Sequence, residues 1–109
     1  DSFTGLAGTG YLYVPEDCAA GAGCRLHVAF HPCAPDGAAV AEAWRTRAGY
    51  NRWADGNRIV ILYPQVQATA IPYNPDACWD WWGYTGPAYA TRAGAQIDAV
   101  RRMIDTLTR

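Results

Sequence analysis

Very few residues in this chain could serve as the nucleophile of a hydrolytic enzyme. Serine occurs once, at Ser2, and lies outside any G-x-S-x-G sequence, the pattern that places a nucleophile on a sharp strand-to-helix turn. All nine basic residues are arginine, which excludes Schiff-base chemistry on a lysine. The residues alone therefore predict no complete Ser-His-Asp triad within this sequence.

A second group that could do chemistry is His31-Pro32-Cys33, which directly follows a predicted strand. Backbone N–H groups at the end of such a strand, beside the start of a helix, can be directed at a developing oxyanion. Cys33 could also be a nucleophile with His31 as its base, but not if its sulfur is oxidised. The simpler alternative is a turn fixed by a disulfide. His27, inside the strand, is interpreted as a packed core residue.

The cysteines favour disulfide bonds over a zinc site, because they form no tandem C-x-x-C pair and the spacing of the two histidines matches no common zinc finger. Cys18 and Cys24 flank a short loop of alanine and glycine, so we predict that they pair with each other. That choice leaves Cys33 to pair with Cys78. Two disulfides predict a secreted protein, extracellular or periplasmic.

The segment 78–84, Cys-Trp-Asp-Trp-Trp-Gly-Tyr, is the densest aromatic stretch of the chain. Its rings could cap a small core or contact a ligand, and the sequence leaves both interpretations open. The rings in question are those of Trp79, Trp81, Trp82 and Tyr84. Asp80 lies between two tryptophans, where a carboxylate must be hydrogen-bonded or paired. The cations that could pair with it are Arg52, Arg58 and Arg92.

Composition narrows the class of protein that must position these residues. The chain has 109 residues, of which 50% are apolar and 17% charged, with a net charge of −1. This is the composition of one globular domain, without the basic face expected for nucleic acid or an anionic membrane. Its apolar runs are far shorter than a bilayer span.

The apolar pattern predicts strands at 10–14, 26–30 and 59–63, helices at 38–48 and 93–108, and an ordered loop at 65–90. Residues 1–9 are interpreted as a linker or processed tail. Strand 26–30, helix 38–48 and strand 59–63 form a β-α-β unit, so the two strands should be parallel. Both faces of a parallel strand pair must be covered by helices, and a chain of this size supplies few helices. We therefore expect an exposed apolar face that meets another chain. Trp44 and Trp53 are predicted to lie mainly in the core.

Several stretches together resemble the extracellular poly(3-hydroxybutyrate) depolymerases, and more narrowly the C-terminal portion of their circularly permuted type. The resemblance covers about residues 9–109. The stretches that carry it are GYLYVP at 10–15, CRLHVAFHPC at 24–33, GYNRWAD at 49–55, LYPQ at 62–65 and CWDWWGY at 78–84. The fold that it implies is a partial α/β-hydrolase catalytic domain over 10–109, with three layers.

The resemblance also implies roles for individual residues. Cys33 matches the cysteine whose backbone amide contributes to the oxyanion hole, although Pro32 departs from the family's glycine and removes one N–H. Trp81 matches a tryptophan of the polymer-binding crevice, and the neighbouring substrate wall would include Trp79, Trp82, Tyr84 and His31. The Ser-Asp-His triad would lie on a partner polypeptide or another segment.

The function expected from this resemblance is serine-type hydrolysis of poly(3-hydroxybutyrate) or related short-chain hydroxyalkanoate esters, without a cofactor. The expected partners are the triad-bearing segment and a polyester, with no nucleic acid and no membrane. Two alternatives belong to other classes. One is a non-catalytic module that binds polymer or carbohydrate through the loop 79–84, and the other is a small disulfide-bonded structural or inhibitory protein.

Overall fold

The computed structural model describes residues 3–19, 23–33, 44–46 and 48–108. The predicted strands and the last helix follow the predicted order, and a short helix near the N-terminus and a helix directly before the third strand are additions to it. They are β1 (Tyr11–Tyr13), α1 (Glu16–Ala19), β2 (Arg25–Val28), α3 (Tyr50–Asn57), β3 (Ile59–Tyr63) and α4 (Ala95–Leu107). The three strands and the C-terminal helix lie within two residues of the bounds that their apolar patterns predict.

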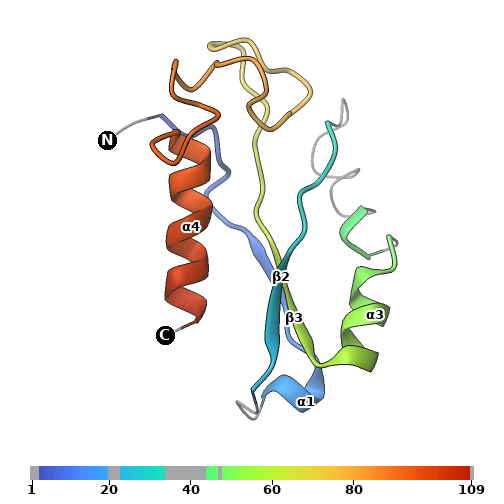
Figure 1. The fold of residues 1–109 in the computed structure, drawn as a ribbon. Coiled ribbons are helices and arrows are strands. Elements are labelled where there is room, and N and C mark those ends of the chain that lie inside the picture. The colour runs from blue at the N-terminus through green and yellow to red at the C-terminus, as the bar shows by residue number, and fades with distance from the viewer. Residues whose placement is uncertain (1–2, 20–22, 34–43, 47, 109) are drawn as a thin grey trace.

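The strands form one mixed sheet in the order β1-β3-β2. β3 pairs in parallel with β2, as the β-α-β pattern predicts, and antiparallel with β1. As the central strand, β3 has no edge exposed to water, which suits its unbroken apolar sequence Ile-Val-Ile-Leu-Tyr. Figure 1 shows α3 on one side of this sheet and α4 on the other, so the α/β class and its three layers are confirmed.

The core lies between the sheet and α3. Its buried members are Ala29, Ala54, Ile59, Ile61 and Tyr63, and Trp44 packs against them at 5.9 Å from the Tyr63 ring, as predicted. The prediction for Trp53 is wrong, because 44% of this residue is exposed, although its ring contacts His27 of β2 edge to face at 5.3 Å.

Gly49 separates α3 from the preceding helical turn. It adopts φ 91°, a left-handed conformation that favours glycine, and this confirms that the predicted helix stops here. Most of the predicted helix 38–48 lies outside the described residues. The separate helix that begins at Tyr50 was not predicted from the sequence.

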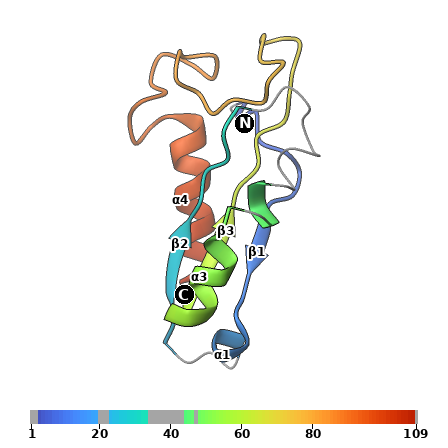
Figure 2. The same cartoon turned by 90° about the vertical axis from the view of Figure 1, so that its right-hand side faces the viewer.

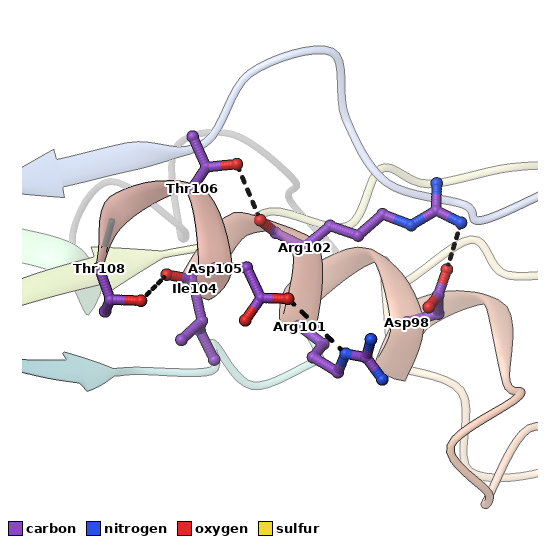
Figure 3. Close-up of polar contacts among 7 residues, drawn as sticks. All are labelled: Asp98, Arg101, Arg102, Ile104, Asp105, Thr106 and Thr108. Carbon is purple, nitrogen blue, oxygen red and sulfur yellow. Dashed lines mark hydrogen bonds and ion pairs between the residues drawn. The ribbon is translucent and has the colours of Figure 1, made fainter.

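The outer face of α4 carries the two ion pairs that its i, i+4 spacing predicts (Figure 3). Asp98 and Arg102 approach to 2.7 Å, and Arg101 and Asp105 to 3.8 Å. Exposed pairs of this kind contribute about 0.3–0.5 kcal/mol each, so they do not fix where the helix sits. Among the described helices, none is long and apolar enough to cross a membrane.

The apolar stripe of α4 is only partly covered. Val100 is buried, whereas Ile97 and Leu107 are each 43% exposed. Two cavities of about 530 Å³ and one of about 440 Å³ lie along the junction between this helix, the sheet and the loop beyond it. At the end of β2, Phe30 is 51% exposed, although β3 is covered by the chain's own residues.

Residues 4–7, expected within a linker or tail, instead pair with the chain beyond β3. Leu6 forms a bridge with Val66, Ala7 N–H donates to Gln65 O at 2.8 Å, and Gln67 N–H donates to Gly5 O at 3.0 Å. In Figure 2 this N-terminal stretch runs up to the same end of the sheet as the long loop. The structure therefore gives residues 4–7 a place in the folded domain.

Candidate functional site

The candidate site lies at the end of the sheet where β2 and β3 lead into the long loop. The disulfide Cys33–Cys78 ties the segment after β2 to this loop, and Cys18–Cys24 closes the small loop after α1. Both predicted pairings are thus present. Because the sulfur of Cys33 is bonded to Cys78, the alternative of a Cys33 nucleophile with His31 as its base is wrong.

His31 is buried and connects two segments of backbone. The N–H of Val66 can only donate, so Nε2 of His31 must accept that bond, at 3.0 Å. The neutral ring then carries its proton on Nδ1, which donates to Pro32 O at 2.9 Å. Nε2 thus joins the segment after β2 to Val66 beyond β3, while the Nδ1 bond is local to the turn at Pro32. The contact of His31 with substrate stays a prediction.

Cys33 itself is exposed at the end of the described stretch 23–33. The residues that follow it, where the helix beside the oxyanion hole is expected, lie outside the described residues. The role of the Cys33 amide therefore stays a prediction from the family resemblance.

Asp80 is the centre of a tight turn in the aromatic segment. Its Oδ1 accepts N–H bonds from Trp82 (3.2 Å), Gly83 (2.6 Å) and Tyr84 (3.1 Å). Its Oδ2 accepts the Thr85 N–H at 2.9 Å and also the Thr85 hydroxyl. Of the two possibilities, a hydrogen-bonded carboxylate or one paired with an arginine, the structure shows the first: among the described residues Asp80 makes no ion pair, and local N–H groups fill its acceptor positions.

These hydrogen bonds set the protonation of Asp80. Partial burial by itself would raise the pKa of the carboxyl, but bonds from the Thr85 hydroxyl and from the backbone amides of Thr85, Gly83 and Tyr84 outweigh it. The pKa of Asp80 therefore lies below the ordinary value of 3.8. The group is an anion throughout the neutral range, and it holds the turn as a charged acceptor.

A second polar framework lies beneath the aromatic segment. The buried side chain of Asn74 accepts from Cys78 N–H and donates to Cys78 O, both at 3.0 Å. The Tyr84 hydroxyl donates to the same carbonyl at 2.7 Å. Burial, as the largest influence, raises the pKa of this hydroxyl, so it stays protonated and able to donate.

Gln96, in the first turn of α4, completes this framework. Its Oε1 accepts the Asp80 N–H at 2.7 Å, while its Nε2 donates to the Tyr84 hydroxyl (2.7 Å) and to Thr4 O (2.9 Å). One buried amide thus joins the helix, the aromatic segment and the N-terminal stretch. The sequence analysis missed Asn74, Thr85 and Gln96, and their only signal was a polar residue type in an otherwise apolar or aromatic neighbourhood.

The aromatic residues divide into two groups. Trp79 faces inward, with its ring 5.0 Å from Phe30 and 5.6 Å from His31. Its indole Nε1 is buried, and no acceptor for it lies among the described residues. Trp79 is thus partly buried against Phe30 and His31, and its place in the substrate wall stays a prediction.

Trp81 and Trp82 form the outward group. Trp81 is 69% and Trp82 42% exposed, and their rings meet edge to face at 5.0 Å. The Tyr84 ring lies 4.8 Å from Trp82 and backs the pair. Large exposed rings on an ordered loop offer flat apolar area to a ligand, which suits an aliphatic chain better than a charged molecule.

Comparison with known proteins gives relatives of one kind. The chain is 43% identical over 106 residues to a poly(3-hydroxybutyrate) depolymerase of Delftia acidovorans, and 40% identical over 106 residues to a polyhydroxybutyrate depolymerase of Talaromyces funiculosus. These alignments cover 95% and 88% of this chain. No family model matches the chain.

Two solved structures have the same fold. One is a serine-to-alanine variant of a PHB depolymerase complexed with an R3HB trimer, with a TM-score of 0.85 and 37% identity. The other is a PHB depolymerase from Penicillium funiculosum, with a TM-score of 0.82 and 36% identity. Each match covers 94% of this chain, so the resemblance to PHB depolymerases and the partial α/β-hydrolase fold are confirmed.

The matches cover nearly all of this chain but only a minor part of each relative. The chain spans 21% and 31% of the length of the two curated relatives and 35% of each solved structure. It is therefore homologous to one part of a PHB depolymerase.

Proposed function

We propose that this chain is the portion of a secreted serine esterase that supplies the aromatic substrate wall for poly(3-hydroxybutyrate) or related hydroxyalkanoate esters. The observation that carries the proposal is the exposed Trp81–Trp82 pair, held on an ordered loop in a chain 43% identical to a poly(3-hydroxybutyrate) depolymerase. An aliphatic polyester has no N–H or O–H donors along its chain, so its affinity must come mainly from apolar area against such rings.

The chemistry of the assembled enzyme would be acyl transfer. A serine oxygen attacks the ester carbonyl while a histidine takes its proton, and the alcohol end of the polymer leaves with that proton. Water then hydrolyses the acyl-enzyme and releases a hydroxyacid. Within this chain, the Cys33 amide would stabilise the oxyanion, and Trp81 and Trp82 would hold the polymer beside it.

The triad would come from another segment or a partner polypeptide. Two features support this part of the proposal. In the described part of the chain, β2 is an edge strand with only β3 beside it, so another strand can pair with its open edge. The cavities along α4, together with the half-exposed Ile97, leave apolar surface for that segment to cover.

The role of the rings is tested by replacing Trp81 in the assembled enzyme. A binding hot spot of this kind contributes on the order of 2 kcal/mol, so Trp81→Ala should weaken polymer hydrolysis roughly 30-fold at low polymer concentration. The melting temperature should stay nearly unchanged, because Trp81 is mostly exposed. Trp53→Ala is the matched control, since Trp53 is also exposed but lies on α3. A loss of thermal stability with full polymer turnover would instead make Trp81 a packing residue.

The alternative of a non-catalytic binding module is separated by an assay of residues 1–109 alone. This polypeptide should hydrolyse a soluble nitrophenyl ester no faster than buffer, because its one serine has no assigned base partner. Turnover that a serine-reactive phosphonate abolishes would contradict the proposed location of the triad. If the native protein, with every chain that co-purifies, is also inactive on polyester, the binding-module hypothesis replaces the esterase.

A further inference from the structure

The outward group of the aromatic loop has little packing of its own. Trp81 is 69% exposed and Trp82 packs only on Trp81 and Tyr84 among the rings, so burial alone does not fix their positions. Figure 1 shows the loop that carries them extending beyond the end of the sheet, away from the core between β3 and α3. Their placement must therefore come from the backbone beneath them.

The backbone of the turn at 82–85 is held by one side chain, while Asn74 and Gln96 hold the residues before it, Cys78 and Asp80. Asp80 accepts hydrogen bonds from the N–H groups of four consecutive residues, 82–85, and from the Thr85 hydroxyl. The turn also requires Gly83, whose φ of 95° is left-handed. A charged acceptor that gathers four N–H groups holds a turn more tightly than neutral bonds would, because charge-assisted bonds are about twice as strong.

We infer that Asp80 is a positioning residue for the polymer, whose carboxylate holds Trp81 and Trp82 in the one relative arrangement that binds an extended polyester chain. This inference rests on the proposed function and adds a residue to it. Asp80 acts through the rings and does not itself contact substrate. Without the carboxylate, the polymer would have to order both rings when it binds, and that ordering lowers its affinity.

Four substitutions at two positions test the inference in the native protein that contains this chain. Asp80→Ala removes all five bonds, and Asp80→Asn keeps one oxygen but loses the charge. Thr85→Val removes one hydroxyl and keeps the shape, whereas Thr85→Ser should restore the bond. Asp76→Asn is the matched control, because Asp76 is an exposed carboxylate in the same loop.

The expected result is a split between affinity and turnover. Asp80→Ala should raise the polymer concentration at half-maximal rate roughly tenfold, the size expected when two large side chains lose their preorganisation, and should change the rate at saturating polymer less than twofold. Asp80→Asn and Thr85→Val should give smaller shifts in the same direction, with Thr85→Ser and Asp76→Asn close to the parent.

A spectroscopic measurement tests the arrangement of the rings directly. The electronic transitions of two indoles 5.0 Å apart in an edge-to-face arrangement couple, and this coupling contributes a signal to the circular dichroism spectrum. The coupled signal is identified as the part of the spectrum that Trp82→Phe removes. Asp80→Ala should lose this signal while the far-ultraviolet spectrum of the sheet and helices remains. If Asp80→Ala fails to fold, the milder Thr85→Val and Thr85→Ser pair gives the same comparison.

Failure of this inference can be told apart from failure of the proposed function. If Trp81→Ala weakens polymer binding but Asp80→Ala and Thr85→Val leave both binding and the coupled signal unchanged, the inference is overturned and the proposed function stands. If Asp80→Ala removes the coupled signal while polymer binding is untouched in both Asp80→Ala and Trp81→Ala, the rings do not bind polymer and both are overturned. A loss of signal and affinity together supports the inference.

Discussion

The sheet and the long loop beyond it are ordered by different forces. Around β3, apolar side chains such as Ile61 and Ala54 are fully buried, and order follows from excluding water. In the loop 64–94, order comes from polar side chains that bond to the backbone, from Asp80, Asn74 and Gln96, and from one disulfide. The difference shows how a surface with little apolar burial can still be ordered.

The sheet and the loop should also differ in how substitutions change their stability. Apolar burial is spread over many atoms, so the sheet tolerates moderate changes of shape. A polar framework depends on a few donors and acceptors, and each buried group that loses its partner costs about 1–3 kcal/mol. We therefore expect changes in the sheet to act on global stability and changes in the loop to act first on local structure.

The largest expected effect is loss of the covalent link between the two regions. Cys33 and Cys78 are 45 residues apart, so opening this disulfide should cost roughly 4 kcal/mol in the chain-entropy model. The double substitution Cys33→Ala and Cys78→Ala should lower the free energy of unfolding by that amount in urea titrations. The control, Cys18→Ala with Cys24→Ala, opens a separation of only six residues and should cost about half as much. Equal losses would mean that loop closure is not the source of the stability.

Next in size is a truncation in the sheet. Ile61 is fully buried, so Ile61→Ala should lower the free energy of unfolding by about 3 kcal/mol, through lost apolar burial and the cavity left behind. Ile71 lies in the loop and is 93% exposed, which makes Ile71→Ala the matched control with an expected change near zero. Thermal and urea unfolding measure both. A comparable loss from Ile71→Ala would show that the loop tip is covered in the native protein.

A smaller effect is expected from the polar framework. Asn74→Ala leaves the N–H and C=O of buried Cys78 without this partner, which should cost about 2 kcal/mol. Hydrogen exchange should be faster at the amides of 78–85 but not in β3. The control is Asn57→Ala, which removes an exposed bond to Trp53 O. Faster exchange throughout β3 in the Asn74 variant would contradict the independence of the two regions.

The smallest expected effect is a response to acid confined to the loop. The pKa of Asp80 is lowered in the fold, so its contribution is fully present above the ordinary value of 3.8 and is lost only as the pH falls through the lowered value. The coupled signal of Trp81 and Trp82 should therefore stay constant from neutral pH to 3.8 and decrease below it. In Asp80→Asn this acid step should be absent. A step of the same size in that variant would assign the titration to another group.

The two regions were not equally predictable from sequence. The unbroken run at 59–63 and the stripe of the last helix define a strand and a helix by themselves, because their periodicity is local. The start of α3 was missed, since the left-handed Gly49 can end one helix and allow another to begin. Trp53 was misplaced because its residue type suggests full burial, whereas it packs on His27 of β2 and still leaves 44% of its surface exposed.

In the candidate site, cysteine spacing and the family resemblance were enough to predict both disulfides and the exposed Trp81. The partners of Asp80 were not predicted, because backbone N–H groups are present everywhere and leave no signal in a sequence. Gln96 could not be predicted either, because its contacts reach Thr4, which is 92 residues away in the chain. Such contacts depend on the folded arrangement of three segments.

The open edge of β2 has a further consequence, for the solubility of the chain. In the described part of the fold, this strand has β3 on one side only, and an unpaired strand edge is a template on which identical strands can add to one another. Its apolar Leu26 and Val28 are only partly covered, and Arg25 at its start is the charge that opposes such stacking. This edge is therefore a place where copies of the chain can aggregate, and a preparation that stays dispersed at high concentration has the edge protected.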